Sequence, residues 1–164
     1  MLDHASLQAI LPQRYPMLLI DRVVRVEPRV SITAVKAITA VEPCYRDLPD
    51  GTPPSGYAYP VSLLVESFGQ AAAILWFLDR DELSTSDDAM PMLAVVRDYR
   101  VHGEAYPGDV VRHEVRLDHA VDGAAFGTGE ILVGDRVIAT VGSLLAVVRP
   151  RSSLLPEPAP AVLG

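Results

Sequence analysis

The stretch Val61–Leu78, which reads VSLLVESFGQAAAILWFL, is the most apolar helix-like segment of the chain. Apolar side chains occupy nearly every face of such a helix, so other elements must wrap around it. Glu66 interrupts the run midway. A carboxylate in apolar surroundings loses hydration and needs a hydrogen-bonding partner or a proton. Glu66 is therefore the first candidate for a catalytic residue, the structural alternative being a carboxylate at a subunit boundary or bonded to a backbone amide.

Gln70 lies one helical turn beyond Glu66. Residues four apart share a helix face, so we expect Gln70 to orient the Glu66 carboxylate or a substrate carbonyl. The helix is entered from Pro60, and Ser62 is a candidate N-cap because serine side chains accept hydrogen bonds from free amides of the first turn.

Strand-like patterns lie on both sides of this helix. A short helix is expected over residues 3–11, and Gly134-Asp135 is a hairpin signal. Segments dense in β-branched residues, or alternating in polarity, lie at residues 23–30, 31–41, 92–101, 110–119, 124–133 and 136–148. One long helix with antiparallel strands around it predicts an α+β fold in which a curved sheet wraps a single helix.

Two segments are rich in proline. Residues 43–60 contain five prolines and two glycines, which exclude a helix or a central strand there. Loops of that length in a compact domain are usually functional. From Pro150 onward proline recurs without any period, so we expect a folded domain over residues 1–149 and a disordered tail over residues 150–164.

Composition narrows the class of protein. The 164 residues, 49% of them hydrophobic, suit one domain, and the net charge of −7 argues against nucleic-acid binding. Cys44 is the only cysteine, which excludes an internal disulfide framework, and no His, Asp or Glu spacing favours a metal site or another cofactor. The longest uninterrupted apolar run, Ala71–Leu78, is too short for a membrane helix. We expect a cytoplasmic protein without membrane contact.

The segment Leu11–Arg22, LPQRYPMLLIDR, closely resembles the opening LPHRYPFLLVDR of the hotdog-fold 3-hydroxyacyl-acyl carrier protein dehydratases of fatty-acid and polyketide synthesis. The resemblance continues through Glu42-Pro43, through the pattern P-x-x-L-x-x-E-x-x-x-Q that begins at Pro60, and through the YPGD sequence at residues 106–109. It covers residues 8–149 and implies a hotdog fold, in which a curved antiparallel sheet wraps one central helix.

The same resemblance implies a site. Members of that family pair a His, in a Gly-His-Phe-Pro segment of the loop before the helix, with an acid on the helix of the other subunit. Glu66 matches the acid. The His is missing, because residues 46–51 read RDLPDG and no histidine lies between His4 and His102. Backbone amides around Pro60, Val61 and Ser62 would bind the thioester carbonyl, although Val61 stands where the family has glycine.

Other side chains near the position of the missing His are candidate substitutes for it. Tyr57 and Tyr59 are expected to line an acyl tunnel or a dimer seam, because an unperturbed phenol is a poor base at neutral pH. Asp47 and Asp50 lie in a loop that usually holds solvated carboxylates. His113 shares a strand face with valines, which favours a satisfied core or interface residue over a catalyst.

Three functions remain open. The first, which we favour, is a dehydratase subunit that supplies Glu66 to a site shared with a His-bearing hotdog partner. The second is a thioesterase or isomerase that uses Glu66 alone. The third is a non-catalytic acyl-binding or scaffold subunit. Each implies an acyl carrier protein or coenzyme A thioester as ligand, and a homodimer or heterodimer of hotdog chains.

Overall fold

The computed structural model describes residues 1–78, 89–121 and 123–150. Its helices are α1 (His4–Ile10) and α2 (Val61–Phe77), with two short 3-10 helices, η1 (Pro43–Tyr45) and η2 (Pro54–Tyr57). The strands are β1 (Arg22–Glu27), β2 (Ser31–Ala37), β3 (Ala89–Val101), β4 (Val110–Val121), β5 (Ala124–Val133) and β6 (Arg136–Pro150).

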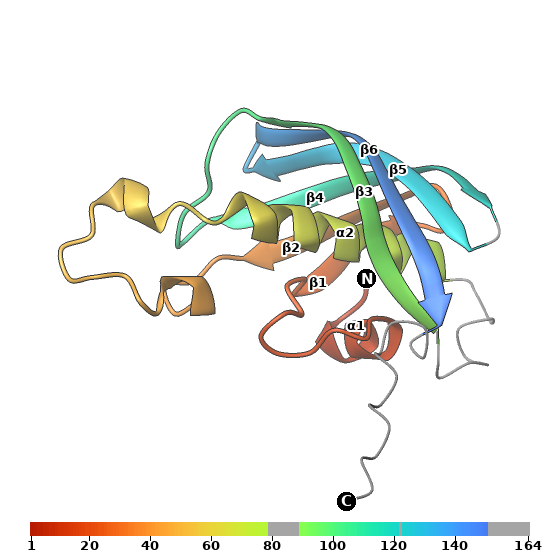
Figure 1. Cartoon of the computed structure of the whole chain (residues 1–164), viewed down its shortest axis with the longest axis horizontal. Helices are drawn as coiled ribbons and strands as arrows, with labels where there is room; N and C mark the ends of the chain where they lie inside the picture. The colour runs from red at the N-terminus through yellow and green to blue at the C-terminus, as the bar shows by residue number, and fades with distance from the viewer. Residues whose placement is uncertain (79–88, 122, 151–164) are drawn as a thin grey trace, which may run out of the picture.

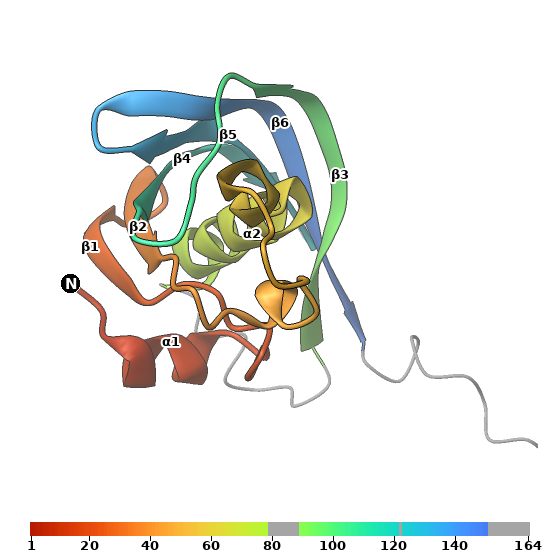
Figure 2. The ribbon, with the colours of Figure 1, turned by 90° about the vertical axis from the view of Figure 1, so that its left-hand side faces the viewer.

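The six strands form one antiparallel sheet in the order β1-β2-β4-β5-β6-β3. The sheet curves around α2, and α1 lies on the open side below the helix (Figure 2). This arrangement confirms the predicted α+β hotdog fold. Strands β1 and β3 are the two edges of the sheet.

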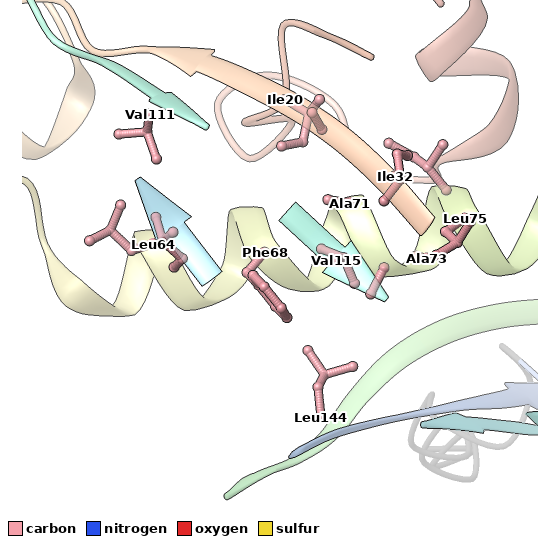
Figure 3. Close-up of a cluster of buried hydrophobic side chains, with 14 of the residues drawn as sticks. Ile20, Ile32, Leu64, Phe68, Ala71, Ala73, Leu75, Val111, Val115 and Leu144 are labelled. Carbon is pink, nitrogen blue, oxygen red and sulfur yellow. The ribbon is translucent and has the colours of Figure 1, made fainter. Parts of the chain in front are cut away.

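The core lies between α2 and the concave face of the sheet. Phe68 and Leu75 of the helix are 1% exposed, and Val111, Val115 and Leu144 face them from β4 and β6 (Figure 3). Burial of these side chains is the main term that stabilises the fold. It also explains why the helix could be so apolar on nearly every face.

Gly129 of β5 lies against both the backbone of β4 and the ring of Phe68 on α2. A Cβ atom added there would lie 2.0 Å from the carbonyl oxygen of Glu114 and 3.0 Å from Cζ of Phe68. A side chain at this position would collide with the backbone of β4, so only glycine fits here.

An 18-residue window within Pro54–Phe77 has the length and the mean hydropathy, 1.3, of a membrane-spanning helix. In the structure 61% of that window is buried inside the fold, as in the core helix of a globular protein. The sheet thus takes the place that lipid would have around such a segment.

Several boundaries differ from the sequence prediction. Strand β1 ends at Glu27, and residues 28–30 form a turn in which Arg29 has a φ of 60°. Helix α2 is N-capped by Pro60 without a side-chain bond, so Ser62 lies inside the first turn and the predicted Ser62 cap is wrong. Gly134-Asp135 forms the predicted β5–β6 hairpin. The predicted tail lies, except for Pro150 at the end of β6, outside the described residues.

The proline-rich loop is not wholly irregular, because it contains η1 and η2. Both 3-10 helices have proline in their first turn, where its fixed φ suits a tight turn and its missing N–H costs nothing. We call residues 43–58 the arm. It projects beyond the end of the sheet, away from the rest of the molecule (Figure 1).

Candidate active site

Glu66 is half-buried and held by Gln70. The Nε2 of Gln70 donates a hydrogen bond of 2.9 Å to Oε1 of Glu66. This bond confirms that Gln70 lies on the same helix face as Glu66. No described protein group bonds to the second carboxylate oxygen of Glu66, which is left available for a ligand.

The side-chain amide of Gln70 uses its oxygen and both its N–H groups in hydrogen bonds within the chain. Its Oε1 accepts from the backbone N–H of Leu19 at 2.9 Å, and its Nε2 also donates to the carbonyl of Met17 at 2.6 Å. The side chain is 1% exposed. Gln70 therefore joins the N-terminal segment to α2 and has no N–H left for a substrate.

A pocket of about 250 Å³ opens beside Glu66. Its polar lining consists of Gln13, Glu66 and Gln70, and the remaining walls come from Gly69, from Met92 and Leu93 of β3, and from Leu144 and Ala146 of β6. A carboxylate next to an amide, between apolar walls, suits a ligand with one polar centre on an aliphatic chain.

Sequence reasoning missed Gln13 as a site residue. Its Oε1 is buried and has no hydrogen-bonding partner. The guanidinium of Arg14 fixes the backbone here, donating to the carbonyls of Leu11 and Gln13 at 2.7 Å each and to that of Gln8 at 3.0 Å. The only sequence signal was the position of Gln13 within the LPQRYP motif, 53 residues before Glu66 along the chain.

No histidine lines this pocket in the described part of the chain. His4 lies beside Gln8 on α1, His102 lies 3.2 Å from Oγ1 of Thr140, and His119 stacks on Phe126. A base for proton transfer to or from a bound ligand would have to be another group of this chain or come from a second chain.

His113 is fully buried on the concave face of β4, where its ring meets Phe68 edge-on at 6.3 Å. Both ring nitrogens lack a hydrogen-bonding partner. The position in the core was predicted, but the expectation of a satisfied residue was wrong. Burial lowers the pKa of His113 to about 3, so the ring stays neutral at physiological pH.

The other predicted site residues lie apart from the Glu66 pocket. Tyr59 is 3% exposed, and burial raises the pKa of its phenol above the usual value. Tyr57 packs against Tyr45 with ring centroids 5.9 Å apart. Pro60, Val61 and Ser62 begin α2, where Val61 is 44% exposed. None of these five residues lines the pocket within one chain.

The pocket lies at an edge of the sheet. Met92 and Leu93 belong to β3, whose one neighbouring strand among the described residues is β6. Met92 and Val95 on this strand are each 38% exposed. An edge strand with free backbone groups and exposed apolar side chains is a ready surface for pairing with another strand. A partner on β3 would cover one wall of the pocket.

Within the described residues, no group of three or more His, Cys, Asp and Glu side chains could hold a metal ion. The polar groups at the pocket are one carboxylate and two amides. Such a set suits proton transfer and hydrogen bonding.

The sequence matches the FabA-like domain family over residues 11–142. It is 33% identical over 150 residues to the 3-hydroxyacyl-[acyl-carrier-protein] dehydratase FabZ of Symbiobacterium thermophilum, an alignment that covers 92% of this chain and 98% of that one. It is also 33% identical to FabZ of Bordetella petrii, over 88% of this chain and 99% of the relative.

Solved structures share the fold. The dehydratase heterocomplex ApeI:P from Xenorhabdus doucetiae matches with a TM-score of 0.74 at 21% identity, covering 90% of this chain and 93% of that one. A mutant thioesterase from Pseudomonas aeruginosa matches with a TM-score of 0.61 at 15% identity, covering 90% and 94%. The motifs around Glu66, the sheet that wraps its helix and the match over residues 11–142 lead to one conclusion: the chain belongs to the FabA-like domain family.

Proposed function

We propose that this chain takes part in the dehydration of 3-hydroxyacyl thioesters, carried by acyl carrier protein, in fatty-acid or polyketide synthesis in the cytoplasm. Glu66 supplies the acid, and a second hotdog chain supplies the histidine base. The observation that carries this proposal is the Glu66 pocket itself, which holds an oriented carboxylate and lies at the free β3 edge, with no histidine among the described residues of its lining.

The chemistry needs two groups. The base removes the proton from C2 of the substrate, and the electrons of that C–H bond form the C2–C3 double bond. The C3–O bond breaks, and Glu66 in its acid form gives its proton to the departing hydroxyl, which leaves as water. Gln70 keeps the carboxyl group turned toward the pocket throughout.

The apolar surroundings suit an acyl chain. Leu144 and Ala146 line both the Glu66 pocket and a narrow apolar crevice that continues along α2. Ala72, Leu75 and Phe126 are among the residues that line the crevice. An acyl group with its C3 hydroxyl at Glu66 would extend its tail along this path.

The test is a mixed complex. Purified chain is combined with a FabA-like protein that carries Gly-His-Phe-Pro in the loop before its helix. Light scattering should show a dimer or a larger assembly, and dehydration of a 3-hydroxyacyl-carrier thioester is followed by the absorbance of the enoyl product. The isolated chain should be weakly active or inactive, because loss of one acid-base partner typically removes a factor of about 10² to 10⁴.

Glu66→Gln should lower dehydration by the mixed complex about 10²- to 10⁴-fold, because the amide keeps the shape of the side chain but has no acidic proton. Assembly and melting temperature should stay unchanged. Glu130→Gln, at an exposed position of β5, is the matched control and should leave activity at the wild-type level. Full activity of Glu66→Gln in the complex would reduce this chain to a scaffold.

The thioesterase alternative has its own outcome in the same experiment. An oriented carboxylate without histidine is also the arrangement that could activate a water molecule. Hydrolysis of acyl thioesters by the isolated chain, lost in Glu66→Gln, would replace the dehydratase proposal.

A further inference from the structure

The outer face of the sheet, which is turned away from α2 (Figure 2), is polar in one part and apolar in another. In the polar part, the direct cross-strand neighbours along β2, β4, β5 and β6 are Thr33, Glu114, Glu130 and Thr140. Such side chains are usual on a sheet face in contact with water. Toward the end of the chain's last strand, β6, the composition of the same face changes.

Six apolar residues on four neighbouring strands form this second part, and we call them the outer patch. Phe126 of β5 lies opposite Leu145 of β6, which lies opposite Val95 of β3. In the next row, Ala124 lies between Val121 of β4 and Val147 of β6. The ring of Phe126 also stacks on the exposed ring of His119, with centroids 4.3 Å apart.

Burial alternates along β6 and places the patch on the outer side. Leu144 and Ala146 are 1% and 6% exposed and belong to the core, whereas Leu145 and Val147 are only partly buried. Val95 is 38% exposed, although its neighbour Val96 packs against the core. Among the described residues, no element covers the outer patch.

The size of the patch limits what can cover it. Its exposed apolar surface is on the order of a few hundred Å², whereas a stable interface between two proteins buries roughly 800 Å² on each partner. The patch is therefore too small to hold a second copy of the chain by itself. It suits a short segment that brings two or three apolar side chains.

The chain itself supplies such a segment next to the patch. Strand β6 ends at Pro150, opposite Ala89 and three residues beyond Val147. The sequence continues with RSSLL at residues 151–155. An extended chain covers about 3.3–3.6 Å per residue, and Val147 lies about 10 Å before Pro150 along the strand. A reversal of the chain at residues 151–153 therefore brings Leu154 and Leu155 within reach of the patch.

The contact would be made by side chains. Strand β6 is paired on both sides, by β5 and β3, so a returning segment cannot add to it as a further strand. Proline at positions 156, 158 and 160 also removes backbone donors from the segment that follows. Because the segment is tethered, its effective concentration at the patch is in the millimolar range, and a contact too weak for a separate peptide suffices.

We propose that Leu154 and Leu155 dock on the outer patch, so that residues 151–155 cover the apolar part of the outer face. The contact has a second consequence for β6. Leu144 and Ala146, which alternate with Leu145 and Val147 on this strand, line the Glu66 pocket. The docked segment thus backs one wall of that pocket from outside.

The first experiment is limited proteolysis of the full-length chain. Trypsin cleaves after Arg151, and mass spectrometry measures the release of residues 152–164. Docking shields this bond, and cleavage follows the fraction of molecules in which the segment is free. In Leu154→Ser/Leu155→Ser, cleavage after Arg151 should be about fivefold to tenfold faster than in wild type. Val162→Ser/Leu163→Ser, which removes an equal apolar pair beyond the prolines, is the matched control and should be cleaved at the wild-type rate.

The reciprocal variant changes the patch and leaves the sequence around the cleaved bond intact. Leu145→Thr/Val147→Thr keeps β-branched side chains on the strand and should accelerate cleavage after Arg151 by the same factor. Val110→Thr, an exposed position at the other end of β4, should have no effect. Cleavage at arginines within the folded domain should stay at the wild-type rate in every variant. If Leu145→Thr/Val147→Thr loosens the domain, the comparison of Leu154→Ser/Leu155→Ser with wild type decides alone.

A wild-type rate of cleavage in Leu154→Ser/Leu155→Ser would overturn the docking. Dependence on protein concentration would also overturn it. If cleavage of the wild type slowed as its concentration rose, while light scattering showed a growing mass, a second copy would be covering the patch. Docking within one chain predicts the same rate at every concentration.

Discussion

The two halves of α2 are built differently. From Gln70 to Phe77 every side chain is buried, whereas in the first nine residues only Leu64, Ser67 and Phe68 are. Glu66 and its pocket belong to the first half, and the second half fills the curve of the sheet. One helix thus anchors the fold at one end and presents a carboxylate at the other. A functional group can sit on a core helix because the other half supplies the packing.

The largest effect on stability should follow from a substitution in the second half of α2. Leu75→Ala removes a side chain that is 1% exposed, and the free energy of unfolding should fall by about 2–5 kcal/mol. Val61→Ala, in the half-exposed first turn, should change it by no more than about 0.5 kcal/mol. Chemical denaturation of both variants checks the difference, and equal losses would show that the halves share the packing evenly.

A smaller effect on stability is expected from His113 of β4, whose ring meets Phe68 in the first half of α2. Because burial lowers the pKa of His113 to about 3, the unfolded chain binds more protons than the folded chain between that value and about pH 6.5. The stability that His113 contributes is therefore present above about pH 6.5 and is lost progressively as the pH falls toward 3. At pH 5 the loss should be about 2 kcal/mol.

Measurement of unfolding free energy from pH 7 to pH 5 tests this. In His113→Leu, the fall in unfolding free energy between pH 7 and pH 5 should be smaller than in wild type by about 2 kcal/mol. His119→Leu, at an exposed position, should show the same pH dependence as wild type. An unchanged slope in His113→Leu would mean that the ring takes up a proton in the folded state.

The smallest expected effect is on substrate binding at the Glu66 pocket, beside the first half of α2. Gln13 has a buried amide oxygen without a partner at the Glu66 pocket, and rotation of the terminal amide, a soft torsion, can turn it toward a substrate hydroxyl. Gln13→Leu should raise KM for a 3-hydroxyacyl thioester about threefold to tenfold in the mixed complex, as expected for one lost neutral hydrogen bond. Gln8→Leu, on the exposed face of α1, is the control.

Much of this design was predictable. The apolar run of residues 61–78 indicated a wrapped helix, and the four-residue spacing of Glu66 and Gln70 indicated their hydrogen bond. Gly134-Asp135 indicated the β5–β6 hairpin because its neighbours alternate and its turn requires a positive φ, which is 58° at Gly134. These signals are local, so the sequence carries them directly.

What was missed depends on long-range pairing. Strand β3 pairs with β6, so the pocket wall at Met92 and Leu93 meets Leu144 from a distant segment. Gln13 reaches the site only because Arg14 and Gln70 fix the segment on either side of Tyr15. Nζ of Lys36 lies 2.7 Å from Oε1 of Glu42, and although the two residues are close in sequence, their pairing depends on β2 ending between them. Contacts of this kind leave no periodic pattern in the sequence.

The bonds from Gln70 to Met17 and Leu19 tie the orientation of Glu66 to a segment about fifty residues upstream. The segment from Met17 to Leu19 is thus part of the support that orients the Glu66 carboxylate. A truncation that removed this segment would disturb the carboxylate, and one that began beyond Leu11 would also take the buried side chains of Leu7 and Leu11 from the core.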